Sequence, residues 1–181
     1  MKTRFFILLG LIAIAITSCD INGSTNNTPV IKFVTAPFIN KTDTLNVYLT
    51  DESDVIRLDT IHVGDTVTFR MLFYGYSNNL STCNIIQSDT SATKMILPST
   101  NSLDSVFLSS SSDYSAGKFI IKNKISSLYF PFRYVAKKVS NDVKLSFYIT
   151  SDANLSGLGS NSASFVLKTP IKSKKLASAA E

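Results

Sequence analysis

Apolar residues recur at every second position through the middle of this chain. In residues 67–74 the apolar side chains of Val67, Phe69, Met71 and Phe73 alternate with Thr68, Arg70, Leu72 and Tyr74. Residues 143–149 alternate in the same way. Successive side chains of a strand point to opposite faces, so this pattern predicts β-strands that each bury one face.

The same short-period pattern extends from Val30 to Ile171, and stretches with helical periodicity are missing. Turn-forming Asn, Asp, Ser, Gly and Pro residues separate the runs. Strands are expected at residues 30–35, 45–50, 55–63, 67–74, 83–87, 94–97, 106–109, 118–122, 130–137, 143–149 and 163–168. Short strands at such intervals predict an all-β fold, a single antiparallel β-sandwich domain over residues 30–171.

Two polar segments flank this domain. Residues 19–29 contain Asn, Thr, Ser and Gly without periodicity, which is typical of a flexible spacer. Residues 172–181 are basic and carry no apolar pattern beyond Leu176, so we expect a disordered tail. The chain of 181 residues therefore holds one domain between a spacer and a tail.

The first residues have the layout of an export signal. Lys2 and Arg4 precede an apolar run from Phe5 to Ile16, which is shorter than the roughly 20 residues that span a bilayer as a helix. The run ends in Ile16-Thr17-Ser18-Cys19, which resembles the lipobox of bacterial lipoproteins. The resemblance implies that residues 1–18 are a lipoprotein signal peptide, that Cys19 is lipidated, and that the protein is anchored to a membrane without spanning it.

Composition and charge restrict the chemistry that the domain can carry. The chain has one histidine and two cysteines, so a His/Cys zinc site would need carboxylate ligands. Removal of residues 1–18 lowers the formal excess of cations from five to three, and several lysines lie near the C-terminus. We therefore expect no basic stripe and no nucleic-acid partner. Once Cys19 is acylated, Cys83 has no disulfide partner and is expected to be a small buried side chain.

Residues 59–69, DTIHVGDTVTF, resemble the strand–turn–strand entry of bacterial immunoglobulin-like domains. Together with the lipobox, this makes the chain similar to small Bacteroidota-type lipoproteins in which a spacer and one immunoglobulin-like β-sandwich follow a lipidated cysteine. The resemblance implies a location in the cell envelope, most plausibly at the outer membrane, and leaves open whether the domain faces the periplasm or the cell surface. It gives location and fold more firmly than activity.

No motif in the chain requires catalysis. His62 is the only imidazole, and its neighbours Ile61 and Val63 place it in a predicted strand. The mature chain has no G-x-S-x-G motif. The acidic residues 51–54 fit a solvated turn, or less readily a calcium site. We expect a protein that is not an enzyme and that holds no metal and no cofactor.

Aromatic residues supply the best candidate for a binding surface. If Phe130 and Phe132 point into the core, Tyr129 and Arg133 point outward, where a ring and a guanidinium could contact a sugar. Tyr74 and Tyr76 lie at the end of the strand at residues 67–74. The candidate ligand surface is therefore formed by Tyr74, Tyr76, Tyr129 and Arg133. The alternative is that a second layer covers these side chains.

Four short matches resemble the O-glycosylation sequon of exported Bacteroidota proteins, which is Asp, then Ser or Thr, then an aliphatic residue. Their hydroxyl residues are Thr44, Thr60, Thr66 and Ser105. All four are expected near strand starts or turns. Asp and Thr also recur at such positions for structural reasons.

These observations favour a lipid-anchored envelope protein whose sandwich binds a glycan or another envelope protein without catalysis. A structural or assembly subunit of an envelope complex is the alternative, and a hydrolase that uses His62 comes third.

Overall fold

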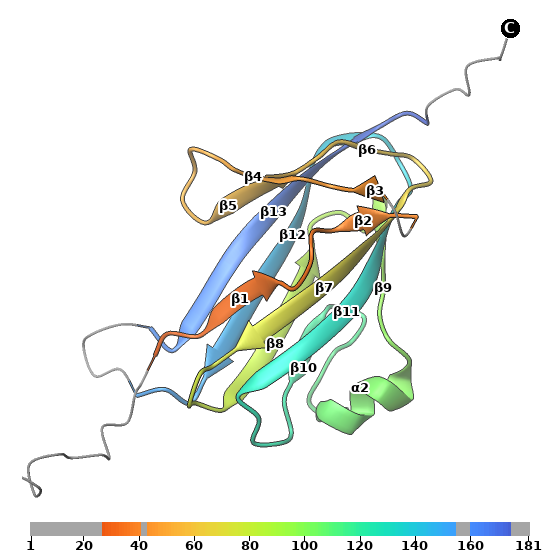
Figure 1. The fold of residues 1–181 in the computed structure, drawn as a ribbon. Coiled ribbons are helices and arrows are strands. Elements are labelled where there is room, and N and C mark those ends of the chain that lie inside the picture. The colour runs from red at the N-terminus through yellow and green to blue at the C-terminus, as the bar shows by residue number, and fades with distance from the viewer. Residues whose placement is uncertain (1–26, 41–42, 155–159, 175–181) are drawn as a thin grey trace, which may run out of the picture.

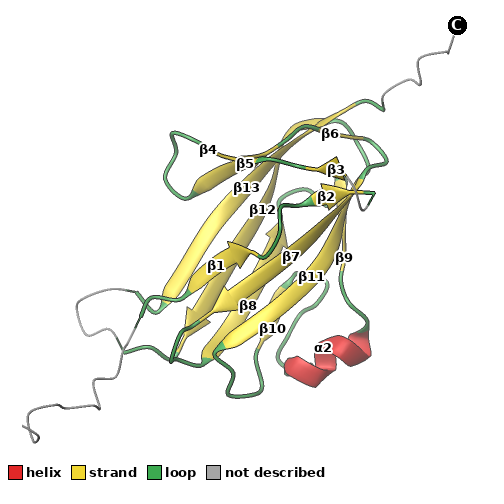
Figure 2. Cartoon of the chain, viewed as in Figure 1, coloured by secondary structure: helices red, strands yellow, loops and turns green. Residues whose placement is uncertain are grey.

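The structure is a computed structural model in which residues 27–40, 43–154 and 160–174 are described. Two β-sheets pack face to face over these residues, and one short helix lies at their side (Figures 1 and 2). Cys19, the predicted signal peptide and most of the spacer lie outside the described residues. Within the described part, no helix has the length and apolarity to cross a membrane.

The first sheet has the order β3-β2-β7-β11-β9, and β1 pairs with β7 beside β2. Its strands are β1 (Val30–Phe33), β2 (Phe38–Ile39), β3 (Asp43–Thr44), β7 (Thr66–Tyr74), β9 (Thr93–Ile96) and β11 (Ser127–Ala136). All the pairs in this sheet are antiparallel.

The second sheet has the order β10-β8-β12-β13-β5-β4, and β6 pairs with β13. Its strands are β4 (Val47–Leu49), β5 (Val55–Leu58), β6 (Ile61–His62), β8 (Leu80–Gln87), β10 (Lys118–Ile120), β12 (Ser140–Ser151) and β13 (Ser162–Lys172). The prediction of an all-β sandwich is confirmed. The sheet departs from a purely antiparallel arrangement where β13 runs parallel to β5 and β6.

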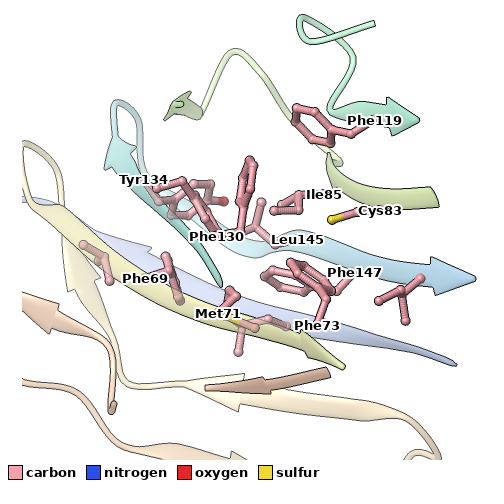
Figure 3. Packing of buried hydrophobic residues seen from close by; sticks show 14 of the residues in the cluster. Phe69, Met71, Phe73, Cys83, Ile85, Phe119, Phe130, Tyr134, Leu145 and Phe147 are labelled. Atoms are coloured by element: carbon pink, nitrogen blue, oxygen red, sulfur yellow. The ribbon is translucent and has the colours of Figure 1, made fainter. Parts of the chain in front are cut away.

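Aromatic side chains from both sheets meet in the core. Phe69 of β7 stacks on Phe132 of β11, with ring centroids 5.0 Å apart. Phe132 in turn approaches Phe147 of β12 in the opposite sheet at 6.2 Å. Figure 3 shows the side chains of Phe69 and Phe147 in this core together with Cys83. Cys83 is completely buried and free, as expected, so the described domain is held by apolar packing.

The predicted strand at residues 55–63 is divided into β5 and β6. Both pair with β13, β5 through residues 166–168 and β6 through Ile171 and Lys172. Pro170 lies between these two segments of β13 and has no N–H to donate to a ladder. The break on one strand thus coincides with a proline on its neighbour.

The predicted strand at residues 106–109 is wrong. Residues Thr100–Val106 form the helix α2, and Ser99 caps its N-terminus by accepting a hydrogen bond from the Ser102 N–H. Leu103 is the buried residue of this helix, and Phe107 directly after it forms an isolated bridge with Ile121. Leu103, Val106 and Phe107 have helical spacing and pack on the core, but three apolar positions are too few to distinguish one helical turn from a short strand.

The chain enters the sandwich at one end and leaves it at the other (Figure 1). β1 starts opposite Tyr74, at the end of β7, whereas β13 finishes beside β6. β13 includes Lys172, so it runs one residue beyond the predicted end of the domain. An anchor that precedes β1 would therefore hold the end of the sandwich where β7 finishes.

Candidate ligand-binding surface

The outward face of the first sheet contains three of the four predicted ligand-surface residues. The fourth, Tyr76, lies just beyond the end of β7. Residues of β11 alternate strictly between buried and exposed positions. Phe130 and Phe132 are buried, whereas Tyr129 is 51% exposed. The predicted orientation of these residues is confirmed, and Arg133 is exposed on the same face as Tyr129.

Tyr74 and Tyr76 form a pair at one end of this face. Their ring centroids are 4.6 Å apart, and both side chains are half-buried. Tyr76 lies in the turn after β7 with a φ of 59°. Tyr74 pairs with Val30 on one side and Ser127 on the other. The tyrosine pair therefore lies at the end of the sandwich where the chain enters.

The other two predicted residues lie further along the same face. Tyr129 is opposite Leu72, two residues from Tyr74, and Arg133 is opposite Thr68. At about 3.4 Å per residue, the strip from Tyr74 to Thr68 is roughly 20 Å long. The structure thus aligns the four predicted side chains along one strip and does not gather them at a point.

Three shallow hollows adjoin one another across this face. The first, of about 570 Å³, lies between β2 and β7, and the second, of about 280 Å³, lies over β11 and the end of β9. They share Thr68 as a wall. The third, of about 230 Å³, lies between β11 and α2 and shares Pro98 and Pro131 with the second. The three hollows adjoin through these shared lining residues, and we call them together the groove. Arg133 lines the second hollow and Tyr129 the third.

Two important residues of the groove were not among the predicted ones. The Arg70 guanidinium carbon lies 5.2 Å from the centroid of the Phe38 ring, and both side chains line the first hollow. Period-two alternation already placed Arg70 on the face opposite Phe69. Phe38 lies in a strand of two residues, which is too short for any periodic signal.

Two of the four predicted glycosylation residues lie at a strand start or in a connection, as expected. Thr60 lies between β5 and β6, and Thr66 begins β7. Thr44 is instead the last residue of the two-residue strand β3. Ser105 lies in α2 and donates a hydrogen bond to the Ser102 carbonyl. Thr44 and Ser105 are exposed, and Thr44 also lines the first hollow.

The aspartates of three of these sequons accept hydrogen bonds within the fold. Asp59 accepts hydrogen bonds from the Asn46 N–H at 2.7 Å and from the Tyr48 hydroxyl at 2.9 Å. Asp65 accepts from the His62 N–H at 2.8 Å, and Asp104 accepts from the Tyr114 hydroxyl at 2.8 Å. These contacts support the structural explanation of the motif, whereas modification of the hydroxyls stays a prediction.

His62 and the acidic cluster lie away from the groove. The His62 Nδ1 is 3.7 Å from the Asp65 carboxylate, in the tight turn that Gly64 closes with a φ of 96°. Residues 51–54 connect β4 to β5, and Glu52 of this connection forms an ion pair of 2.6 Å with Lys168. Among the described residues, no three His, Cys, Asp or Glu side chains are grouped to hold a metal ion.

Comparisons with known proteins concern the fold alone. No protein-family model and no curated protein matches the chain. Among solved structures, a DUF4466 family protein from Parabacteroides merdae matches with a TM-score of 0.39, 12% identity and coverage of 75% of this chain and 45% of that one. Native alpha-2-macroglobulin from Escherichia coli, from domain MG7 to the C-terminus, matches with a TM-score of 0.40, 9% identity and coverage of 81% and 24%.

A third match is a complete small module. The cohesin module of a family 33 glycoside hydrolase from Clostridium perfringens has a TM-score of 0.36 and 14% identity, with 78% of this chain and 100% of that one covered. The chain spans less than half the length of the first two structures. At these identities the chain is similar to the three proteins only as a β-sandwich.

Proposed function

We propose that this protein is an exported, lipid-anchored lipoprotein of the cell envelope, most plausibly of the outer membrane, whose β-sandwich binds a glycan without catalysis. The observation that carries the proposal is the open groove on the outward face of the first sheet. Its lining includes aromatic rings, two prolines and two arginines.

The lining of the groove suits a sugar chain. Tyrosine and phenylalanine rings offer flat apolar surfaces to the C–H faces of sugars, and arginine offers several N–H donors in one plane. Three adjoining hollows in a row fit an extended ligand better than a compact small molecule, which usually occupies one enclosed pocket. The groove therefore favours a polymer that lies along or across the strands.

The position of the groove also agrees with a membrane anchor at Cys19. Ten residues lie between Cys19 and Val30, which at about 3.3 Å per residue allows a reach of at most about 4 nm. Lipid on Cys19 would hold the sandwich close to the membrane by the end where Tyr74 and Tyr76 lie, and the groove would extend away from the membrane surface.

The alternative is an assembly subunit that docks on an envelope protein. It is supported by the exposed side chains of Val34 and Tyr129, which lie on the same face. Docking of a partner by strand addition is disfavoured, because the edge strands offer little backbone for pairing. Among the described residues, the edge strands β3, β4, β9 and β10 have between two and four residues. The groove is therefore the better candidate for a binding surface. A hydrolase that uses His62 remains the third candidate.

A glycan array probed with the full chain in detergent tests the proposal. Tyr129→Ala in the groove is compared with Tyr148→Ala, a matched exposed tyrosine on the outward face of the second sheet. We expect Tyr129→Ala to lower the signal and Tyr148→Ala to leave it unchanged. The proposal is overturned if the folded chain binds no glycan, or if both variants bind like the unchanged chain.

The anchor is tested separately by protease treatment of intact cells, with Cys19→Ala as the control. Loss of the protein from intact cells would place the domain at the cell surface. Digestion only after rupture of the outer membrane would place it in the periplasm and favour the assembly partner. Release of wild-type protein into the soluble fraction, as for Cys19→Ala, would contradict the lipid anchor.

A further inference from the structure

Four basic residues form a diagonal row across the first sheet. Lys32 lies opposite Leu72, two residues from Arg70. Arg70 lies opposite Pro131, two residues from Arg133, and Arg133 lies opposite Ile96, two residues from Lys94. Each step moves to the next strand and two residues along in the same direction. The row therefore crosses β1, β7, β11 and β9 in order.

The spacing of the row follows from the geometry of a sheet. Diagonal neighbours on adjacent strands are about 7–8 Å apart, so three steps cover roughly 20–25 Å. The middle two residues, Arg70 and Arg133, line the first and second hollows of the groove. The row thus passes through the groove and extends beyond it at both ends.

The charges in this row are not balanced within the described part of the chain. All four side chains are exposed and none of them forms an ion pair there. The outward positions of β1, β2, β7, β9 and β11 include no Asp or Glu. On the second sheet, by contrast, Lys144 pairs with Asp142 at 3.3 Å and Lys168 pairs with Glu52 at 2.6 Å. The first face therefore carries a local positive charge that a bound anion would neutralise.

We propose that the ligand of this groove is an acidic polysaccharide, whose carboxylate or sulfate groups contact the row Lys32–Arg70–Arg133–Lys94. This inference rests on the proposed glycan-binding function and names the class of glycan. Arginine binds carboxylates and sulfates through two parallel hydrogen bonds. The rings of Phe38 and Tyr129 and the prolines beside the row supply the apolar contacts that sugar rings need, which favours a glycan over another polyanion.

The test uses one polymer in two charge states. Binding of the full chain in detergent is measured with polygalacturonate and with the same polymer after its carboxyl groups are reduced to alcohols, which removes the charge and keeps the sugar chain. We expect binding to polygalacturonate, at least about tenfold weaker binding to the reduced form, and weakening as salt rises from about 0.05 M to about 0.3 M. The double variant Arg70→Ala/Arg133→Ala should lose at least about tenfold in affinity.

Three single variants and one further probe complete the experiment. Lys32→Ala and Lys94→Ala change exposed ends of the row and should each weaken binding about two- to fivefold, whereas Lys144→Ala on the second sheet should change it less than twofold. Equal binding of the native and reduced polymers would overturn the acidic class and leave the glycan-binding function standing. Equal binding of single-stranded poly-dT and polygalacturonate would overturn the choice of a glycan. If the chain binds neither polygalacturonate nor its reduced form, this inference is overturned, while the glycan array still tests the function.

Discussion

The backbone of Gly117 lies directly against the carbonyl group of Ile85. The Ile85 N–H donates a hydrogen bond of 2.8 Å to the Gly117 carbonyl oxygen. A Cβ atom added to Gly117 would lie 1.9 Å from the Ile85 oxygen, and Gly117 has a φ of 70°. Only glycine fits this contact, which joins the loop before β10 to β8.

A comparison of two alanine substitutions tests this contact. Gly117→Ala combines an unfavourable φ with a clash against backbone, so we expect a loss of more than about 3 kcal/mol in the free energy of unfolding. Gly64→Ala has the unfavourable φ of 96° but no atom within 4 Å of the new Cβ, so we expect a loss of about 1–2 kcal/mol. Urea denaturation of both variants checks the order, and equal losses would refute the steric explanation.

Two threonine hydroxyls are expected to contribute differently to the stability of the domain. Thr169 is fully buried, and its hydroxyl has no hydrogen-bond partner among the described residues. Thr169→Val removes an unsatisfied polar group without changing the shape of the side chain, so stability should stay equal or rise by up to about 2 kcal/mol.

Thr82→Val is the matched control. The Thr82 hydroxyl shares a hydrogen bond of 2.7 Å with the Thr150 hydroxyl. We expect this variant to lose about 0.5–1.5 kcal/mol. Denaturation curves for the two variants should therefore shift in different directions, and a clear loss of stability in Thr169→Val would show that its hydroxyl is satisfied in solution.

Two loop aspartates make the stability of the domain depend on acid pH. Hydrogen bonds from the Ser115 hydroxyl and the Ala116 N–H lower the pKa of Asp113, and those from the Ser91 hydroxyl and the Ala92 N–H lower the pKa of Asp89. In the unfolded chain these carboxyl groups titrate near their ordinary value of about 3.9. The folded state thus binds fewer protons in acid, and the stabilisation is present above that value and is lost as pH falls below it.

Melting temperatures measured from about pH 6 to about pH 2 check this dependence. The chain with Asp89→Asn and Asp113→Asn should be less stable at pH 6 and should show a smaller decrease in acid, because two of the groups responsible no longer titrate. An unchanged decrease in the double variant would assign the acid sensitivity to other carboxylates.

The thiol of Cys83 should be inert in the folded protein. Burial raises the pKa of Cys83 well above its usual value, and the side chain has no exposed surface. Because thiolate is the reactive form, we expect modification by a thiol reagent only when the domain opens, at least about a hundredfold more slowly than in denaturant. Full-length protein with Cys19→Ala isolates the response of Cys83, and rapid modification under native conditions would contradict its place in the core.

Local alternation predicted much of this fold, including the orientation of neighbouring strand residues. The run at residues 67–74 corresponds to most of β7, and the outward position of Tyr129 follows from the inward positions of Phe130 and Phe132. These features depend on one strand and its two faces, which a period of two reveals directly.

Features that depend on the pairing of distant segments could not be predicted in this way. Lys32, Arg70, Lys94 and Arg133 are separated by 24 residues or more, and only the register of four strands places them in one row. The groove also requires Phe38, from a strand of two residues, and the wall formed by α2, whose sequence has one buried apolar residue.

A glycan that occupies the outward face of the first sheet can be trapped there by photo-crosslinking in cells. A photoreactive amino acid is placed at Leu72 on that face or at Ser146 on the outward face of the second sheet. We predict adducts at position 72 whose added mass is removed by periodate oxidation, and none at position 146. A protein crosslinked at position 72, or carbohydrate adducts confined to position 146, would show that the groove does not hold a glycan.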